Sequence, residues 1–181
     1  MRVYANEETV NQAKREKIGS IADKIRSVLR VETPVDLEKV IEALGGRIEY
    51  LGPSADRPEA SIEKDPHRAR GFVIRLAGDK VIARQRFSLA HELGHLFLHM
   101  GFADIERWRS APNFVESYNR QGYGEQEYEA HEFAAAFLMP SAEYKQMLAA
   151  SGSDVSKVAE HFDVSREAAL YRGRWLEVIN W

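Results

Sequence analysis

The sequence predicts an α+β protein in which a small, mainly antiparallel sheet packs on several helices. Three observations lead to this fold class. Apolar residues recur every three or four positions over 86–100, as in an amphipathic helix. Short apolar or alternating runs at 47–51, 71–76 and 80–83 are typical of strands. From residue 125 onward helical spacing returns, which predicts a helical C-terminal part.

The composition is that of an ordinary globular chain. Its 181 residues suffice for one domain with a sizeable core, so we expect a single domain over 1–181. Hydrophobic residues make up 44% and charged residues 29%, and the net charge of −3 gives no reason to expect binding to nucleic acid or membranes. Cysteine is absent, so a metal would need histidines and carboxylates. No signal-peptide core or membrane-length apolar run is present, and we expect a cytoplasmic protein.

The N-terminal part is predicted to hold two helices, a strand and a loop. Asp36 is placed to cap the second helix, and Gly45 follows its last residue. A weak strand is expected near Ser61-Ile62, and His67 is expected to be exposed in the loop. In chain order these elements span residues 7–30, 36–44, 47–51 and 52–70.

A β-hairpin is predicted over residues 71–83, because two apolar runs flank Ala77-Gly78-Asp79. Its second strand would run almost directly into the amphipathic helix. We expect one strand of this hairpin to form an edge of the sheet.

The amphipathic helix carries His91-Glu92-x-x-His95. Positions i and i+4 lie on one face of a helix, so the two histidines could bind one zinc ion, each at about 2.0–2.1 Å. Glu92, on the flank of that face, could take a proton from a water molecule that the metal activates. The alternative is a surface helix with two unrelated histidines. Gly94 costs about 1 kcal/mol relative to alanine in a helix, which indicates that another backbone passes close by.

His99 continues the row of histidines but is not expected to bind the same ion. Eight residues of helix span about 12 Å, so one zinc ion cannot reach both His91 and His99 at ligand distance. Position 101, which would hold the third histidine of a longer metal-binding pattern, is glycine. We therefore expect His99 to support a ligand or to end the helix.

Residues 101–124 form a long connection that is rich in aromatic residues. Connections of this length are often lids or binding loops. The alternative, which fits the sequence equally well, is a surface segment whose aromatic side chains simply pack down.

A second informative helix is predicted over residues 125–140. A zinc ion held by two histidines of one helix needs a carboxylate from a neighbour, and the candidates are Glu127, Glu129 and Glu132. We favour Glu127, with Glu129 as the alternative; all three could also be solvated acids. His131 lies one turn after Glu127 and could support a zinc ligand.

The C-terminal part is predicted to form a helix over 141–150 and two more at 154–162 and 165–178. The last two have the outline of a helix-turn-helix, with Asp163 in the turn. Their basic residues are balanced by acids, whereas a DNA-reading unit shows a basic footprint. We therefore expect these helices, including His161, to pack on the rest of the protein and not to bind DNA.

Two of these stretches together resemble a known family. Residues 86–95, Arg-Phe-Ser-Leu-Ala-His-Glu-Leu-Gly-His, with Leu98-His99 after them, resemble the signature of the ImmA/IrrE family of zinc metallopeptidases. Residues 127–134 with Leu138-Met139-Pro140 resemble that family's second motif. The resemblance covers most of the chain, because further stretches fit the family's layout: residues 33–37, Val164-Ser165 and Arg172.

The resemblance implies a zincin-like fold, with a small twisted sheet, an active-site helix and a second helix that donates the third ligand. It implies that His91 and His95 bind Zn2+, that Glu92 is the catalytic base, and that the glutamate-rich motif supplies the third ligand. It also implies cytoplasmic cleavage of a helix-turn-helix repressor or another regulatory protein. This chain departs from the family at His131, where Asn or Asp is usual.

The main hypothesis is therefore a zinc endopeptidase. The alternative is a non-catalytic zincin-like toxin or regulator that binds a partner protein, and zinc hydrolysis of a non-peptide substrate also fits the residues. We expect a substrate peptide to add as a strand to the 71–83 edge, with the 101–124 connection on its other side. The residue that stabilises the oxyanion is left open among four candidates, and the oligomeric state is not indicated. The candidates are Tyr118, Tyr123, Tyr128 and His131.

Overall fold

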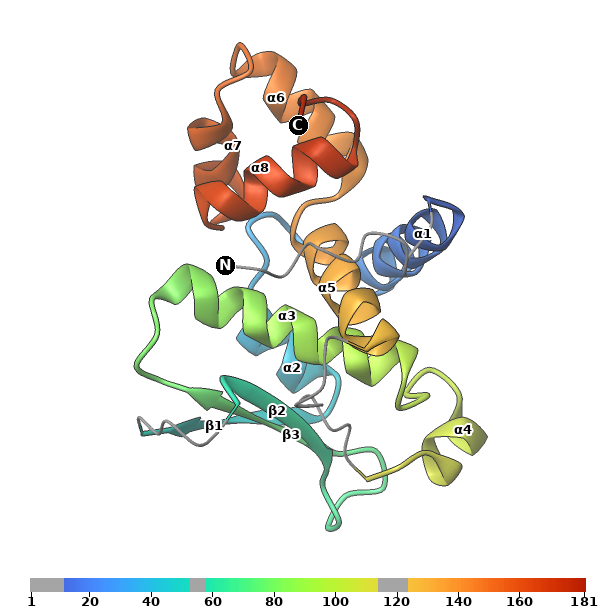
Figure 1. Cartoon of the computed structure of the whole chain (residues 1–181). Coiled ribbons are helices and arrows are strands. Elements are labelled where there is room, and N and C mark those ends of the chain that lie inside the picture. The colour runs from blue at the N-terminus through green and yellow to red at the C-terminus, as the bar shows by residue number, and fades with distance from the viewer. Residues whose placement is uncertain (1–11, 53–57, 114–123) are drawn as a thin grey trace.

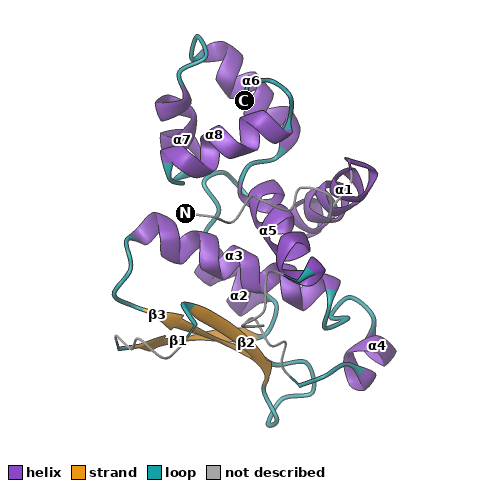
Figure 2. Ribbon diagram, viewed as in Figure 1, coloured by secondary structure: helices purple, strands orange, loops and turns teal. Residues whose placement is uncertain are grey.

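The computed structural model describes residues 12–52, 58–113 and 124–181. Within these ranges the chain has the predicted α+β class, with a three-stranded sheet and a larger set of helices (Figures 1 and 2). The strands are β1 (Gly46–Leu51), β2 (Ala60–Lys64) and β3 (Phe72–Ala77). The helices are α1 (Gln12–Leu29), α2 (Leu37–Ala43), α3 (Ile82–Leu98), α4 (Ile105–Ser110), α5 (Glu125–Leu138), α6 (Ser141–Ala150), α7 (Val155–Phe162) and α8 (Arg166–Trp175).

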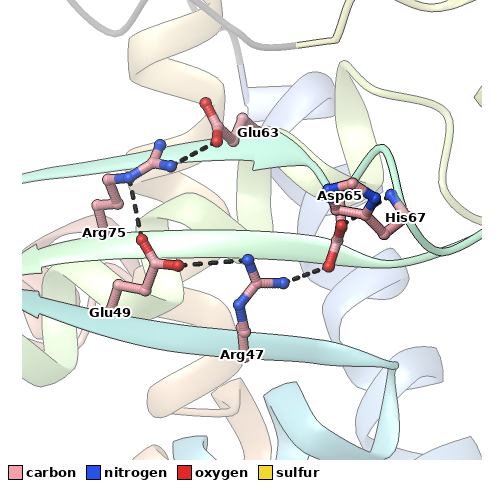
Figure 3. Close-up of polar contacts among 6 residues, drawn as sticks. All are labelled: Arg47, Glu49, Glu63, Asp65, His67 and Arg75. Atoms are coloured by element: carbon pink, nitrogen blue, oxygen red, sulfur yellow. Dashed lines mark hydrogen bonds and ion pairs between the residues drawn. The ribbon is translucent and has the colours of Figure 1, made fainter.

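The sheet has the strand order β1–β3–β2. β1 runs parallel to β3 and β2 runs antiparallel to it, so the sheet is mixed and not mainly antiparallel as expected. Because side chains alternate along a strand, Ile48, Ile74 and Ile62 lie side by side on the face that α3 covers. The opposite face carries charged residues, which Figure 3 shows in detail.

The predicted β-hairpin over 71–83 is wrong, because its second strand does not form. After β3 the chain turns at Gly78-Asp79 and enters α3 at Ile82. Val81 and Ile82, whose branched side chains favour strands, are exposed at the start of this helix. β1 and β2 occupy both edges of β3, so β3 is internal and the edges of the sheet are β1 and β2.

The other predicted elements are confirmed, with some shifted ends. Asp36 caps α2, and its side chain accepts a hydrogen bond from a backbone N–H of the first turn. The weak strand predicted near Ser61-Ile62 is β2. The predicted start of the first helix, residues 7–11, lies outside the described residues, and α8 ends earlier than predicted, at Trp175. In the described parts of the chain, none of the helices combines the length and apolar composition that crossing a bilayer requires.

The connection after α3 is described as far as residue 113 and contains α4, which was not predicted. Phe102 and Trp108 are buried, and the Lys64 ammonium of β2 donates to the backbone oxygen of Trp108. For this part, the prediction that the aromatic side chains pack down is confirmed. The remainder, residues 114–123, lies outside the described residues, so the lid stays a prediction.

Helices α6, α7 and α8 lie at the end of the molecule away from the sheet (Figure 1). Asp163, between α7 and α8, has a left-handed backbone with φ of 52°, a geometry that aspartate tolerates. Arg86 of α3 reaches this turn: its Nε donates to the Asp163 backbone oxygen at 2.9 Å, and its Nη1 donates to that of Val35 at 2.9 Å. Arg172 of α8 is buried and pairs with Glu132 of α5 at 3.0 Å. These contacts join the C-terminal helices to α3 and α5.

Candidate metal centre

The site lies where α3 and α5 pack against each other (Figure 1). The two backbones come very close, because a Cβ built on Gly94 would lie 2.9 Å from the Cα of Ala130 and 3.0 Å from its oxygen. The predicted approach of another backbone at Gly94 is thus confirmed. Gly94 lies between His91 and His95 in sequence, and Ala130 lies one turn after Glu127. The close approach therefore brings Glu127 to the two histidines.

Three side chains with metal-ligand atoms meet at this point. The Nε2 atoms of His91 and His95 lie 3.1 Å apart. Glu127 places Oε2 at 3.1 Å from His91 Nε2 and Oε1 at 3.2 Å from His95 Nε2. Atoms that bind a tetrahedral zinc ion at about 2.0–2.1 Å lie about 3.3–3.4 Å from one another. The spacing of these three side chains therefore fits one metal ion.

Glu92 is buried next to this group, with 2% of its surface exposed, and its Oε2 has no hydrogen-bond partner. Burial, with a further contribution from the charge of Glu127, raises the pKa of Glu92 to about 8. A buried polar atom without a partner costs free energy. A cation beside Glu127 would favour the ionised form of Glu92, because it reverses the sign of the local field. The unpartnered oxygen thus also fits a metal.

Of the three candidate glutamates, Glu127 is the one that meets the histidines. Burial alone would raise its pKa, but the two imidazoles beside it outweigh burial and lower the pKa to about 2. Glu129 lies 2.8 Å from His99, and Glu132 pairs with Arg172. The rotation of α5 thus turns the three carboxylates toward three different partners.

His99 ends α3 and contacts His95, as expected of a residue outside the ligand group. The Nδ1 atoms of His95 and His99 lie 2.9 Å apart, and His99 Nε2 lies 2.8 Å from Glu129 Oε2. Glu129 also pairs with Lys14 of α1. The spacing of four residues between the histidines could have indicated the first contact. No local pattern indicates Glu129 or Lys14.

His131 packs against His91, with ring centroids 5.3 Å apart, and against Phe87 at 4.8 Å. The contact of His131 with the candidate ligand His91 is therefore a packing of the two rings. Burial, and then the neighbouring His91, lowers the pKa of His131 to about 4, so the ring is neutral near pH 7. Of the other residues proposed to stabilise an oxyanion, Tyr128 is half-buried on α5, whereas two lie outside the described residues: Tyr118 and Tyr123.

The comparisons with known proteins agree with this arrangement. A family model, Peptidase_M78 (IrrE N-terminal-like domain), matches residues 55–173. A search of the curated proteins finds no significant match. Among solved structures, a Mycobacterium tuberculosis transcriptional regulator is similar, with a TM-score of 0.60 and 16% sequence identity over 87% of this chain and 46% of that one.

This chain thus spans about half the length of that regulator, and at this identity the likeness concerns the fold alone. The zincin-like fold implied by the sequence resemblance is confirmed. The family model takes in β2, β3 and every helix from α3 to α7, including both motifs that form the candidate site. Because this match covers well over half of the sequence, the chain belongs to the Peptidase_M78 (IrrE N-terminal-like domain) family.

Proposed function

We propose that this chain is a zinc-dependent endopeptidase. The observation that carries the proposal is the meeting of His91 Nε2, His95 Nε2 and the Glu127 carboxylate, with the unpartnered Glu92 oxygen beside them. Two imidazoles, one carboxylate and a nearby free carboxyl are the donor set of a zinc hydrolase. Membership of a peptidase family supports the same reaction class.

In this proposal His91, His95 and Glu127 hold Zn2+. When bound, Zn2+ lowers the pKa of water and polarises the scissile carbonyl. Glu92 accepts the proton of the attacking water at Oε2 and passes it to the leaving nitrogen. Its burial suits both transfers, because bulk water is kept away from this carboxyl and the proton that it accepts stays available for the leaving nitrogen.

The negative oxygen that develops during attack needs a hydrogen-bond donor. His131 is the strongest described candidate, because its ring packs on His91 and is neutral near pH 7, so it keeps one N–H. A His131→Phe variant should keep the ring contact and the metal but lower kcat more than it raises KM.

The substrate peptide is proposed to add to β2, the edge strand that α3 contacts. The Ala77 N–H, at the end of β3, donates to the backbone oxygen of Glu59. In an antiparallel pair, every second residue of a strand directs its N–H and C=O toward the partner strand, so this bond fixes which residues of β2 face β3. The backbone groups of Ala60, Ile62 and Lys64 therefore point away from β3. Lys64 N–H already donates to the Asn113 oxygen at 2.7 Å, so Ala60 and Ile62 are the groups proposed to bind the peptide. This proposal replaces the expectation that the peptide adds to the 71–83 hairpin, because β3 is paired on both sides and offers no free edge.

The proposed substrate is a regulatory protein, such as a helix-turn-helix repressor, that is cleaved in the cytoplasm. A solved structure that shares this fold is described as a transcriptional regulator, which supports a role in gene regulation. The same observation also supports the second candidate, a non-catalytic module that binds a partner protein. The buried Glu92 favours the peptidase, because a module that only binds has no use for an unpartnered carboxyl.

The two candidates are separated by trapping a partner. The zinc-loaded Glu92→Gln variant serves as bait in a pull-down, captured proteins are identified by mass spectrometry, and each is then incubated with the unmodified chain. The peptidase predicts a partner that the unmodified chain cuts and the variant binds without cutting. A partner that binds both forms, and that neither form cuts while zinc is bound, would contradict the peptidase and support the binding module.

A further inference from the structure

A line of hydrogen bonds leads from His95 away from the metal centre. His95 Nδ1 lies 2.9 Å from His99 Nδ1, and His99 Nε2 lies 2.8 Å from Glu129 Oε2. Glu129 also forms an ion pair with Lys14 of α1. The side chains of His95 and His99 are 0% and 6% exposed, and that of Glu129 is 16% exposed. Water therefore has little access to these contacts.

The positions of the protons along this line follow from the chemistry of the groups. The carboxylate of Glu129, paired with Lys14, can only accept, so His99 carries a proton on Nε2. With His99 as a neutral imidazole, its Nδ1 can also only accept. The proton between the two histidines therefore belongs to Nδ1 of His95.

This proton position leaves a lone pair on His95 Nε2. That atom is the one that faces His91 Nε2 at 3.1 Å and Glu127 Oε1 at 3.2 Å. The opposite tautomer would point an N–H at the position where the metal is held. The contact between His99 and Glu129 thus selects the tautomer that can bind a metal.

We propose that His99 and Glu129 are positioning residues that hold His95 as its Nδ1–H tautomer, with the Nε2 lone pair aimed at the metal position before a metal arrives. The inference rests on the proposed function, since it requires His95 to be a ligand. Partners of this kind orient metal-binding histidines, and their removal commonly weakens metal binding about 10–100-fold.

The chain contains a matched control for this pair. His161 of α7 lies 2.8 Å from Glu143 of α6, the same distance that separates His99 from Glu129. Neither residue belongs to the group that could hold a metal. His161→Ala removes a histidine–carboxylate pair of the same spacing, although the His161 side chain is 36% exposed and that of His99 is 6% exposed, so it reports what the loss of such a pair away from the metal does to zinc binding.

The first test measures zinc affinity by competition with a chromogenic chelator. His99→Ala should weaken zinc binding about 10–100-fold, whereas His161→Ala should leave it unchanged. His99→Asn should recover part of the loss, because the Asn Oδ1 can accept the Nδ1–H of His95 in place of the imidazole. A folded His99→Ala variant that binds zinc as tightly as the unmodified chain would overturn the proposal.

The second test needs no variant and reads the proton directly. Nitrogen-detected NMR of the full chain, stripped of metal by a chelator, should show His95 protonated at Nδ1 and His99 protonated at Nε2. A His95 protonated at Nε2 would overturn the proposal, whether or not His99→Ala folds. A different observation would contradict the proposed function. If zinc binds but no peptide is cleaved, the peptidase is contradicted, and both of these results still hold.

Discussion

The outer face of the sheet and the metal centre both gather charged side chains, but they treat charge differently. On the sheet, Arg75 lies 2.6 Å from Glu63 and 3.2 Å from Glu49, and Arg47 contacts Glu49 at 3.3 Å and pairs with Asp65 (Figure 3). Every charge in this network meets one of the opposite sign. The network is therefore satisfied by the protein itself and by solvent.

At the metal centre the charges are not matched in this way. The Nε2 atoms of two histidines and the carboxylate of Glu127 face one another, and the buried oxygen of Glu92 has no partner. Unprotonated histidine nitrogens and carboxylate oxygens can share a site at this distance when a cation lies between them. The comparison teaches that a charge cluster indicates a bound ligand when it is buried and unbalanced, which means that some of its polar groups lack a suitable partner. A balanced cluster, in which every charge meets one of the opposite sign, indicates a structural role.

The largest expected effect is on peptide cleavage, which should depend on the metal centre and not on the charge network of the sheet. Glu92→Gln keeps the side-chain shape but removes the base, so kcat/KM for peptide cleavage should fall by about 10²–10⁴-fold while zinc remains bound. Glu63→Gln, in the sheet network, should leave kcat/KM unchanged. Steady-state kinetics and metal analysis of both variants check this. Equal activity in the two variants would remove Glu92 from the reaction.

The next effect tests the packing that builds the unbalanced cluster. Gly94→Ala should lower the free energy of unfolding by about 1–3 kcal/mol through overpacking against Ala130, although alanine is the better helix former. Gly19 of α1 has no atom within 4 Å of a Cβ position. Gly19→Ala should therefore stabilise the chain, by roughly 0.5–1 kcal/mol. Denaturant unfolding measures both, and stabilisation by both substitutions would contradict the close approach.

A pH effect follows from the unpartnered carboxyl. The folded-state pKa of Glu92 is raised to about 8 by burial, so near neutral pH the folded state holds a proton that the unfolded state has lost. The contribution of Glu92 to the stability of the metal-free chain should therefore fall as pH rises, by about 1–2 kcal/mol between pH 6.5 and 8. Histidines with lowered pKa values act in the opposite direction, because the unfolded chain loses its histidine protons around pH 6.5, so they offset part of this fall below about pH 7.5.

This pH effect is measured as denaturant unfolding of chelated protein at several pH values. Glu92→Gln should abolish the decline above pH 6.5, and bound zinc should suppress it. A decline of the same slope in the unmodified chain and the variant would show that another group causes it.

The smallest expected effect belongs to the balanced cluster. Arg75→Met keeps an apolar stem on the sheet but removes the charge, and a partly exposed ion pair contributes about 0–1 kcal/mol. The loss of stability should be small, should shrink in high salt, and should leave zinc affinity unchanged. Thermal unfolding at two salt concentrations, with a zinc titration, checks this. A change in zinc affinity would contradict the separation of the two clusters.

Local sequence carried enough information to predict the centre of the site. The spacing of His91 and His95 on an amphipathic helix specifies one face, and Gly94 specifies a close neighbour. The choice between Glu127 and Glu129 as the third ligand could not be made from local sequence. It depends on how α5 is rotated against α3, which the packing of Ala130 on Gly94 decides.

The sheet was harder to predict, because its pairing is not local. Val81 and Ile82 have strand propensity, but both edges of β3 are taken by strands that come earlier in the chain. The parallel partner, β1, is joined to β3 through β2 and its loops, and no short pattern reports such a connection. The pairing of Lys14 with Glu129 joins residues far apart in sequence and was missed for the same reason.

The central claim is that the unbalanced cluster holds zinc, and metal analysis of the purified chain tests it most directly. The unmodified chain should contain one zinc ion per chain, and His91→Ala should lose it, because a ligand of the metal is removed. His67→Ala serves as the control, since His67 is an exposed histidine outside the cluster. A His91→Ala chain that still carried one tightly bound zinc ion would contradict the account.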